Sequence, residues 1–294
     1  MISNLLYSLV LELRARTTVD LPGVTGHQVH ALFLNLIRRV EPDLATRLHD
    51  DPEYRPFTVS PLLSAQKNRS PDFLSQGQRC RLRLTLLDGG EIWHHLNQSL
   101  QENGDQPFVL DQGLFTLERV LAAPASDPTG WANWTTWQQL AMSSPQRTIT
   151  LCFTTPTAFH LGARRFVLFP EPALVWDSLV RKWNLYAPEV LHVEPTDLRW
   201  FVEQQMLISD YTLSTTTLSF PRYPQKGFTG VCTYLLKGQV ESRYGTLISC
   251  LAEFARYAGV GYKTTMGMGQ TRAIVSWDEN DVNRRPREIR EARL

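Results

Sequence analysis

The sequence predicts an α+β protein that contains two successive β-α-β-β-α-β units, and two observations lead to this prediction. The chain has 294 residues, which is too long for one ordinary mixed domain and suits two domains of roughly 100–150 residues each. Strand-like and helix-like segments also follow one another in the same order in both halves of the chain. Apolar residues make up 43% and charged residues 20% of the chain, which is typical of folded globular proteins.

The first half gives the order strand, helix, strand, strand, helix, strand. Helices are indicated by apolar residues at three- and four-residue steps, and strands by apolar residues at alternate positions. The predicted elements are Leu5–Arg16, His27–Val40, Pro56–Leu63, Arg79–Leu87, Glu91–Gln101 and Gly113–Val120. A short helix, Asp43–His49, is expected after the first one, because Pro42 suits a helix start. Alternation in the fourth element places Arg79, Arg81 and Arg83 on one face of the sheet, as a basic patch or a solvated face.

The second half repeats this order without repeating the sequence. Its predicted elements, which include a short apolar run at 166–169, are Thr148–Phe159, Phe166–Phe169, Pro172–Trp183, Thr212–Phe220, Phe228–Val240, Tyr244–Ala258 and Gln270–Trp277. Each half therefore has the split β-α-β pattern of ferredoxin-like domains, which is also the fold of the RRM. We expect domains at 1–120 and 148–277, a linker at 121–147, and a basic tail at 278–294 with five arginines.

Charge and cysteine content restrict the class of protein. The formal net charge is +1, which gives no sign of a broadly basic nucleic-acid binder. Residues 1–147 hold 13 Lys and Arg against 15 Asp and Glu, and residues 148–294 hold 17 against 14, so positive charge is concentrated in the second half. The four cysteines include no CxxC pair, and neither a secretion signal nor a membrane-spanning run is visible. We therefore expect a cytoplasmic protein that does not associate with membranes.

A glycine-rich loop lies between the last predicted helix and strand. Four glycines, a lysine and a threonine in this loop are candidates for binding a ligand: Gly259, Gly261, Lys263, Thr264, Gly267 and Gly269. Free backbone N–H groups and an ammonium group could bind a phosphate there. The order helix, loop, strand excludes both a P-loop and a dinucleotide fingerprint. A plain turn is the alternative interpretation.

Histidines are the candidate acid and base groups. His27 and His30 lie three residues apart and share one face of the first predicted helix, and His49 ends the second short helix. A structural role is the alternative for each histidine. No third residue with metal-ligand spacing accompanies the pair, so we expect neither a metal nor another cofactor. Arg164 and Arg165 form a further small basic group in a loop of the second half.

Several segments resemble a known family. The segment Glu41–Leu63, EPDLATRLHDDPEYRPFTVSPLL, contains a leucine–histidine pair followed by an FT-S strand. This segment, the glycine-rich loop, and Thr155–Trp183 resemble the CRISPR repeat-RNA-processing endoribonucleases, and the resemblance extends over Leu5–Trp277. It implies two tandem ferredoxin-like domains and metal-independent cleavage of repeat RNA, which leaves a cyclic phosphate and a 5′-hydroxyl.

The resemblance also implies roles for individual residues. His49 matches the family's catalytic histidine, and Arg55 lies where some relatives have a catalytic lysine. An arginine could stabilise negative charge on phosphorus but would not readily give up a proton. Some relatives have a tyrosine before the position of Asn35, where this chain has Leu34. Others have their histidine on the first helix, which makes His27 or His30 the alternative acid or base.

The RNA-binding residues implied are those of the glycine-rich loop with Arg164 and Arg165, and the partner is CRISPR repeat RNA, as precursor and as mature guide. The main alternative is a weakly active or inactive subunit that binds repeat RNA within a larger CRISPR effector complex. A third possibility is a small-molecule enzyme that holds a phosphate in the glycine-rich loop. The charge balance favours recognition of one RNA by a few well-placed cations over general affinity for RNA.

Overall fold

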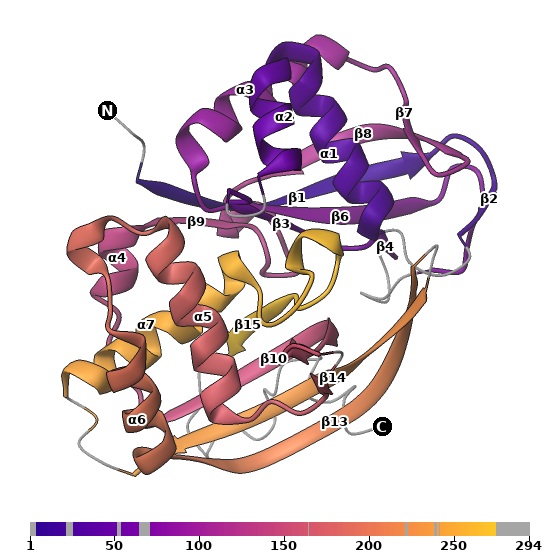
Figure 1. Cartoon of the computed structure of the whole chain (residues 1–294). Helices are drawn as coiled ribbons and strands as arrows, with labels where there is room; N and C mark the ends of the chain where they lie inside the picture. Colours follow the sequence, from indigo (N-terminus) through magenta and orange to yellow (C-terminus); the bar gives the residue numbers. More distant parts are fainter. Residues whose placement is uncertain are drawn as a thin grey trace. The chain divides into compact units, whose positions relative to one another are not determined.

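The computed structural model describes residues 4–21, 26–51, 54–64, 71–163, 165–220, 223–237, 240 and 242–274. The basic tail predicted at 278–294, and Arg164, lie outside the described residues. The chain forms two compact units (Figure 1). Unit 1 comprises Met1–Thr136, Ser219–Pro224 and Lys263–Met268, and unit 2 comprises Trp137–Leu218, Gln225–Tyr262 and Gly269–Leu294.

Unit 1 contains an antiparallel sheet with β1 (Leu5–Ala15) at its centre. Its main strand order is β3-β6-β1-β8-β7. The other strands of this order are β3 (Phe57–Val59), β6 (Arg79–Leu86), β8 (Gly113–Leu121) and β7 (Phe108–Leu110). Strands β1 and β3 precede and follow the first helix in the chain, and β6 lies between them in the sheet. Strands β6 and β8 flank a later helix, and β1 lies between them. Both crossings skip a strand, as the ferredoxin-like split β-α-β pattern requires.

Short elements extend this unit. Strand β4 (Leu63–Ser64) pairs with β6, and β9 (Asn133–Thr136) pairs with β1. Strands β2 (Val19–Asp20) and β5 (Phe73–Leu74) form a separate two-stranded sheet. The 3-10 turn η1 (Pro124–Ser126) precedes β9.

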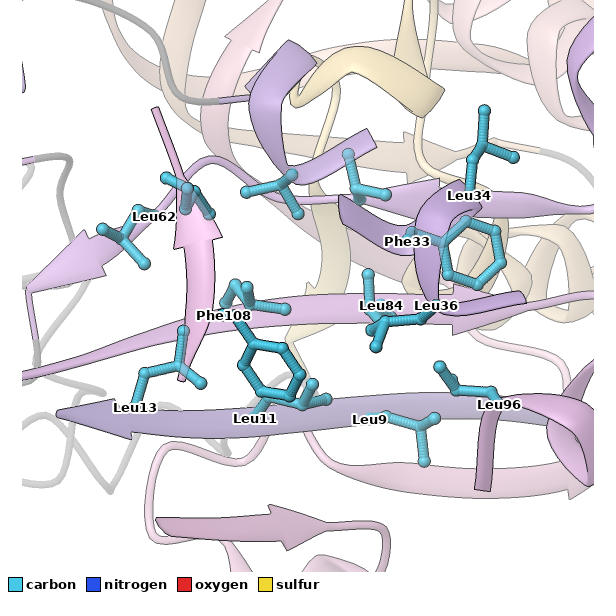
Figure 2. Close-up of a cluster of buried hydrophobic side chains, with 14 of the residues drawn as sticks. Leu9, Leu11, Leu13, Phe33, Leu34, Leu36, Leu62, Leu84, Leu96 and Phe108 are labelled. Atoms are coloured by element: carbon cyan, nitrogen blue, oxygen red, sulfur yellow. The ribbon is translucent and has the colours of Figure 1, made fainter. Parts of the chain in front are cut away.

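Three helices cover one face of the unit 1 sheet: α1 (Gly26–Val40), α2 (Pro42–Asp50) and α3 (Gly89–Asn103). Figure 2 shows how leucines of β1 meet the apolar face of α1, and the labelled core residues are Leu9, Leu11, Leu13, Phe33, Leu34, Leu36, Leu62, Leu84, Leu96 and Phe108. Helix α3 ends at Gly104, whose φ of 53° suits glycine. The predicted elements of this half are thus present, and removing their apolar side chains from water stabilises the unit.

Unit 2 has the same strand arrangement, with the order β13-β14-β10-β15. Its strands are β10 (Thr148–Thr157), β13 (Met206–Phe220), β14 (Tyr223–Leu236) and β15 (Thr271–Ile274). Helices α5 (Pro172–Tyr186) and α7 (Arg243–Ala258) are the two crossings of the pattern, and α6 (Pro195–Gln205) packs beside α5. The fold is therefore α+β with two tandem ferredoxin-like domains, as the order of elements predicts. Among the described helices, none is both long and apolar enough to cross a membrane.

The segment 121–147 has regular structure that its composition does not reveal. It contains β9 and a short helix, α4 (Trp137–Ala141), which belongs to unit 2. In unit 1, Trp131 is 4% exposed and packs with Val10, Leu121 and Ala132. The tryptophan therefore covers part of the face of the sheet that carries Arg83.

The prediction of a solvent-facing basic row on β6 is wrong. Arg79 is exposed and pairs with Glu118 at 2.8 Å, but Arg81 and Arg83 are buried. Arg83 donates a hydrogen bond from Nε to Ser8 Oγ at 2.9 Å, and its guanidinium lies 4.3 Å from the centre of the Trp131 ring. A tryptophan more than forty residues further along the chain thus encloses this arginine, and alternation within one strand does not predict that.

We expect Arg83→Lys to lower the free energy of unfolding by about 1–3 kcal/mol, because lysine cannot both stack on Trp131 and donate to Ser8 in the same planar geometry. Urea unfolding of the two proteins measures the difference. Arg79→Lys, at the exposed end of the same strand, is the matched control and should change little. Equal midpoints for Arg83→Lys and wild type would show that the stacking contributes nothing.

Candidate active site

The start of α1 meets the glycine-rich loop within unit 1. A Cβ atom on Gly26 would lie 2.2 Å from the carbonyl oxygen of Met266 and 2.9 Å from the Cα of Gly267. Gly267 has a φ of +90°, and a Cβ there would lie 2.9 Å from the Cα of Gly26. Two glycines far apart in the sequence therefore let the two backbones touch, and the contact fixes the loop residues 263–268 against the first turn of the helix.

His30 is a buried polar residue at this contact, and its ring has a hydrogen-bond partner in the loop. Its residue exposure is 8%, and its Nδ1 lies 2.8 Å from the carbonyl oxygen of Thr265. A carbonyl can only accept a hydrogen bond, so the geometry assigns the proton of the neutral ring to Nδ1. The Nε2 atom then keeps its lone pair and can act as a base. Phe57 of β3 packs against the ring with 5.4 Å between centroids.

Burial is the main reason why the pKa of His30 lies below its usual value of 6.5. The hydrogen bond to Thr265 acts in the opposite direction, and the charges of Arg55, His49 and His27 lower the pKa further. The environment thus favours the neutral ring at pH 7. The other three candidate residues therefore all lie close enough to His30 to affect its pKa.

The lowered pKa predicts how stability depends on pH. Between the folded-state pKa of His30 and 6.5 the unfolded chain binds more protons, so the wild-type protein loses stability as the pH falls through this window. His30→Asn keeps a hydrogen-bond donor at the position of Nδ1 for Thr265 and does not titrate. We therefore expect the difference in unfolding free energy between wild type and His30→Asn to shift in favour of the variant from pH 7 to pH 5. Parallel curves from urea unfolding at each pH would contradict this.

His49 and Arg55 lie on the stretch that leads from α2 into β3. His49 is at the C-terminal end of α2 and is well exposed, and its Nδ1 is 2.6 Å from Asp50 Oδ1. The Nη2 atom of Arg55 donates to the backbone carbonyl of His49 at 3.1 Å. The carboxylate and the guanidinium thus orient this turn, and the His49 Nε2 remains available for another partner.

His27 lies one helical turn before His30. Its ring is half-buried, and its Nδ1 is buried without a hydrogen-bond partner among the described residues. The position allows His27 to support His30 or to replace it as a base. No group of three or more His, Cys, Asp or Glu in the described part of the chain is arranged to hold a metal ion.

The glycine-rich loop differs from the simple phosphate cradle that its composition suggests. The N–H groups of Gly259, Gly261 and Gly269 donate to Ala255, Ser178 and Pro156 respectively, all within unit 2. These amides serve the fold of unit 2, so they are not free for an anion. The prediction of free N–H groups at these three positions is therefore wrong, because the loop is threaded closely between a helix and a strand.

The remaining loop residues belong to unit 1. Lys263 has a left-handed backbone with φ of 56°, and its ammonium group lies 4.3 Å from the centre of the Phe220 ring and 4.5 Å from that of Tyr223. It also donates to the Tyr223 hydroxyl, and partial burial lowers its pKa. Thr264 is buried, and Gly267 makes the contact with Gly26. Arg165 is exposed in unit 2, at the turn between two short strands.

Three contributors to this site were not predicted from the sequence: the Thr265 carbonyl, Asp50 and Gly26. The carbonyl of Thr265 fixes the tautomer of His30, and a backbone atom leaves no signal in the residue type. Asp50 follows His49 directly, and a carboxylate next to a candidate histidine can be recognised from the sequence. Gly26 lies immediately before His27, and a glycine at the start of a helix can indicate that another part of the backbone packs closely against it.

Comparison with known proteins agrees with the fold. A family model described as the CRISPR Cas6 N-terminal domain matches residues 5–142, and one described as CRISPR-associated endoribonuclease Cas6 matches residues 151–271. The fold and the two family models therefore place the chain in the CRISPR-associated RNA-processing class. Within that class, the chain belongs to the Cas6 endoribonuclease family, as the resemblance of its motifs indicated.

Individual relatives give the extent of the similarity. Cas6 of Streptococcus thermophilus is 28% identical over 124 residues, which are 42% of this chain and 49% of the relative. Cas6 of Mycobacterium tuberculosis is 30% identical over 122 residues, which are 41% of this chain and 37% of the relative. These matches thus span half or less of the curated relatives. A product complex of a Thermus thermophilus Cas6 superposes with a TM-score of 0.78 at 29% identity, over 92% of this chain and 100% of that chain.

Proposed function

We propose that this chain is an endoribonuclease that cuts CRISPR precursor RNA within its repeats by attack of a 2′-hydroxyl on the adjacent phosphorus. The products are a 2′,3′-cyclic phosphate and a 5′-hydroxyl, and the enzyme keeps the mature guide RNA. Membership of the Cas6 family supports the substrate class, and so does the product complex of the Thermus thermophilus relative. The observation that carries the proposal is the hydrogen bond from His30 Nδ1 to Thr265, because it leaves a neutral imidazole nitrogen ready to accept a proton.

Each step of the reaction has a group of this chain to serve it. The Nε2 of His30 takes the proton of the attacking 2′-hydroxyl, and His49 in its protonated form gives a proton to the leaving 5′-oxygen. Arg55 stabilises the negative charge that develops on the phosphorane oxygens and stays charged throughout. His27, one turn from His30, is the alternative base. The proposed chemistry needs no metal ion.

A cleavage assay in EDTA tests the proposal directly. We expect one cut per repeat in a transcript of the repeat that neighbours the gene, with a cyclic phosphate on the upstream product. Removing the 2′-hydroxyl at the cleaved position should abolish cutting while leaving RNA affinity within about twofold, because the nucleophile is lost and the phosphate contacts remain. Cleavage of the deoxy-substituted RNA would refute attack by the 2′-hydroxyl.

The same assay separates this function from that of a non-cleaving RNA-binding subunit. Tight, salt-dependent binding of the repeat with no cleavage under any of these conditions would identify the chain as such a subunit. Binding to no repeat RNA at moderate salt would instead favour a small-molecule enzyme.

A further inference from the structure

Unit 2 contains a cleft that the catalytic proposal does not use. Its volume is about 270 Å³, close to the lower limit for small-ligand sites. The short strand β11 (Phe159–His160) forms one wall, helix α5 forms another, and Gly261 and Tyr262 complete the lining. Strand β12 (Phe166–Val167) pairs with β11. A cleft of this size suits a single flat group better than a folded partner.

Three aromatic rings form a cluster, and two of them, His160 and Tyr262, line the cleft. His160 and Phe166 are directly paired across the two short strands, and their ring centroids are 4.8 Å apart. The ring of Tyr262 lies 5.4 Å from that of His160 and 5.7 Å from that of Phe166. His160 is exposed, and Phe166 is 36% exposed. Flat apolar surface thus remains in water, which is unfavourable unless a ligand covers it.

The backbone holds these rings in place. The Tyr262 N–H donates to the carbonyl of Ala158 at 2.8 Å, and the Gly261 N–H donates to Ser178 Oγ at 2.8 Å. Gly261 has a φ of +78°, and a Cβ there would lie 2.5 Å from the Ala158 oxygen. On the other side, the Leu161 N–H donates to the Arg165 carbonyl at 2.9 Å and closes the hairpin. The ring cluster is therefore formed in advance of binding.

Positive charge surrounds the cluster. Arg181 lines the cleft, and the exposed Arg165 precedes Phe166 directly. The acidic residue of the lining, Asp177, forms an ion pair with Arg199, which offsets its charge. Lys182 also lines the cleft, but its Nζ donates to the carbonyls of Ala258 and Gly259 at 3.0 Å each, and burial lowers its pKa to about 7. The two exposed arginines are therefore the cations on which the site depends. The surroundings therefore favour a ligand that is both flat and negatively charged.

We propose that His160, Phe166 and Tyr262, with Arg165 and Arg181 beside them, form a stacking site for one unpaired base of the bound RNA. Stacking on aromatic rings beside cations is a general way to hold single-stranded nucleic acid. The site lies in unit 2, whereas the His30 cluster lies in unit 1. This inference rests on the proposed function for the identity of the RNA.

The test measures the affinity of repeat RNA by fluorescence anisotropy, using the uncuttable RNA that lacks one 2′-hydroxyl. Two forms are compared, one with intact unpaired segments and one in which those segments carry abasic sugars. We expect Phe166→Ala to weaken binding of the intact RNA about tenfold, as loss of one stacked base does, and to leave binding of the abasic RNA unchanged. Phe166→Tyr keeps a ring and should bind like wild type.

Trp200→Ala is the matched control, because Trp200 is another aromatic residue of unit 2 and is 64% exposed. It should leave both affinities unchanged. Equal affinity of wild type and Phe166→Ala for the intact RNA overturns the stacking site, and so does an equal loss for the abasic RNA. If the three rings bound a peptide instead of RNA, wild type and Phe166→Ala would bind the intact RNA equally.

The two proposals fail in different ways. If the protein cleaves repeat RNA but its affinity does not depend on Phe166, only the stacking site is refuted. The opposite result is that affinity depends on Phe166 but the all-ribose RNA is not cleaved. This result would support the stacking site and refute the catalytic role.

Discussion

Replacing His30 by alanine is expected to slow single-turnover cleavage of repeat RNA by about two to four orders of magnitude, as the loss of a general base does. The physical reason is that no other histidine in the described part of the chain combines a fixed tautomer with such low exposure. His49→Ala should cause a loss in the same range, because the leaving 5′-oxygen then lacks a proton donor. Rates at saturating enzyme, measured with affinity in parallel, report the chemical step alone.

The matched control for both variants is His94→Ala, an exposed histidine on α3 of the same unit. It should cleave at the wild-type rate. If His49→Ala cuts normally and His27→Ala does not, the two histidines of α1 are the acid and base, and His49 has no chemical role. Unchanged cleavage by His30→Ala would remove the residue on which the proposed mechanism depends.

The second large effect is expected from Gly267→Ala. A side chain at Gly267 would require an unfavourable positive φ and would also push against the Cα of Gly26. We expect a loss of about 2–4 kcal/mol in stability from strain and steric conflict together. A fall in cleavage rate should follow even where the protein remains folded, because a shift of the loop moves the Thr265 carbonyl away from His30.

Gly77→Ala separates strain from crowding. Gly77 has a φ of +83° in the same unit, and a Cβ there would meet no atom within 4 Å. It should cost only the backbone strain, about 1 kcal/mol, with normal cleavage. Thermal unfolding and cleavage rates of the two variants make the comparison, and equal losses would mean that the contact between α1 and the loop is unimportant.

Much of the fold could be predicted from the sequence, because long elements repeat their apolar residues regularly. Helix α1 and strand β6 are recognisable in this way. Helix α6 was not predicted, since of its eleven residues only Leu198 and Val202 are buried, which is too few to establish a period. Strand β7 has three residues and gives no pattern at all.

The candidate site could be predicted only at the level of side chains. The sequence identifies His27, His30, His49 and Arg55 as candidates, and the charges of the other three lower the pKa of His30. Their environment depends on backbone atoms and on long-range contacts such as that between Gly26 and Gly267. For the same reason the burial of Arg83 under Trp131 was missed, because burial of an arginine depends on which residue covers it.

The partner of His30 lies 235 residues further along the chain. Ribosomes extend a protein by about 5–20 residues per second, so a nascent chain contains this histidine on the order of ten seconds or more before it contains Thr265. During that interval the ring has no carbonyl to fix its proton and no loop to exclude water. The proposed base therefore gains its partner only after residue 265 has been synthesised, and a shorter nascent chain carries His30 without the carbonyl that fixes its proton.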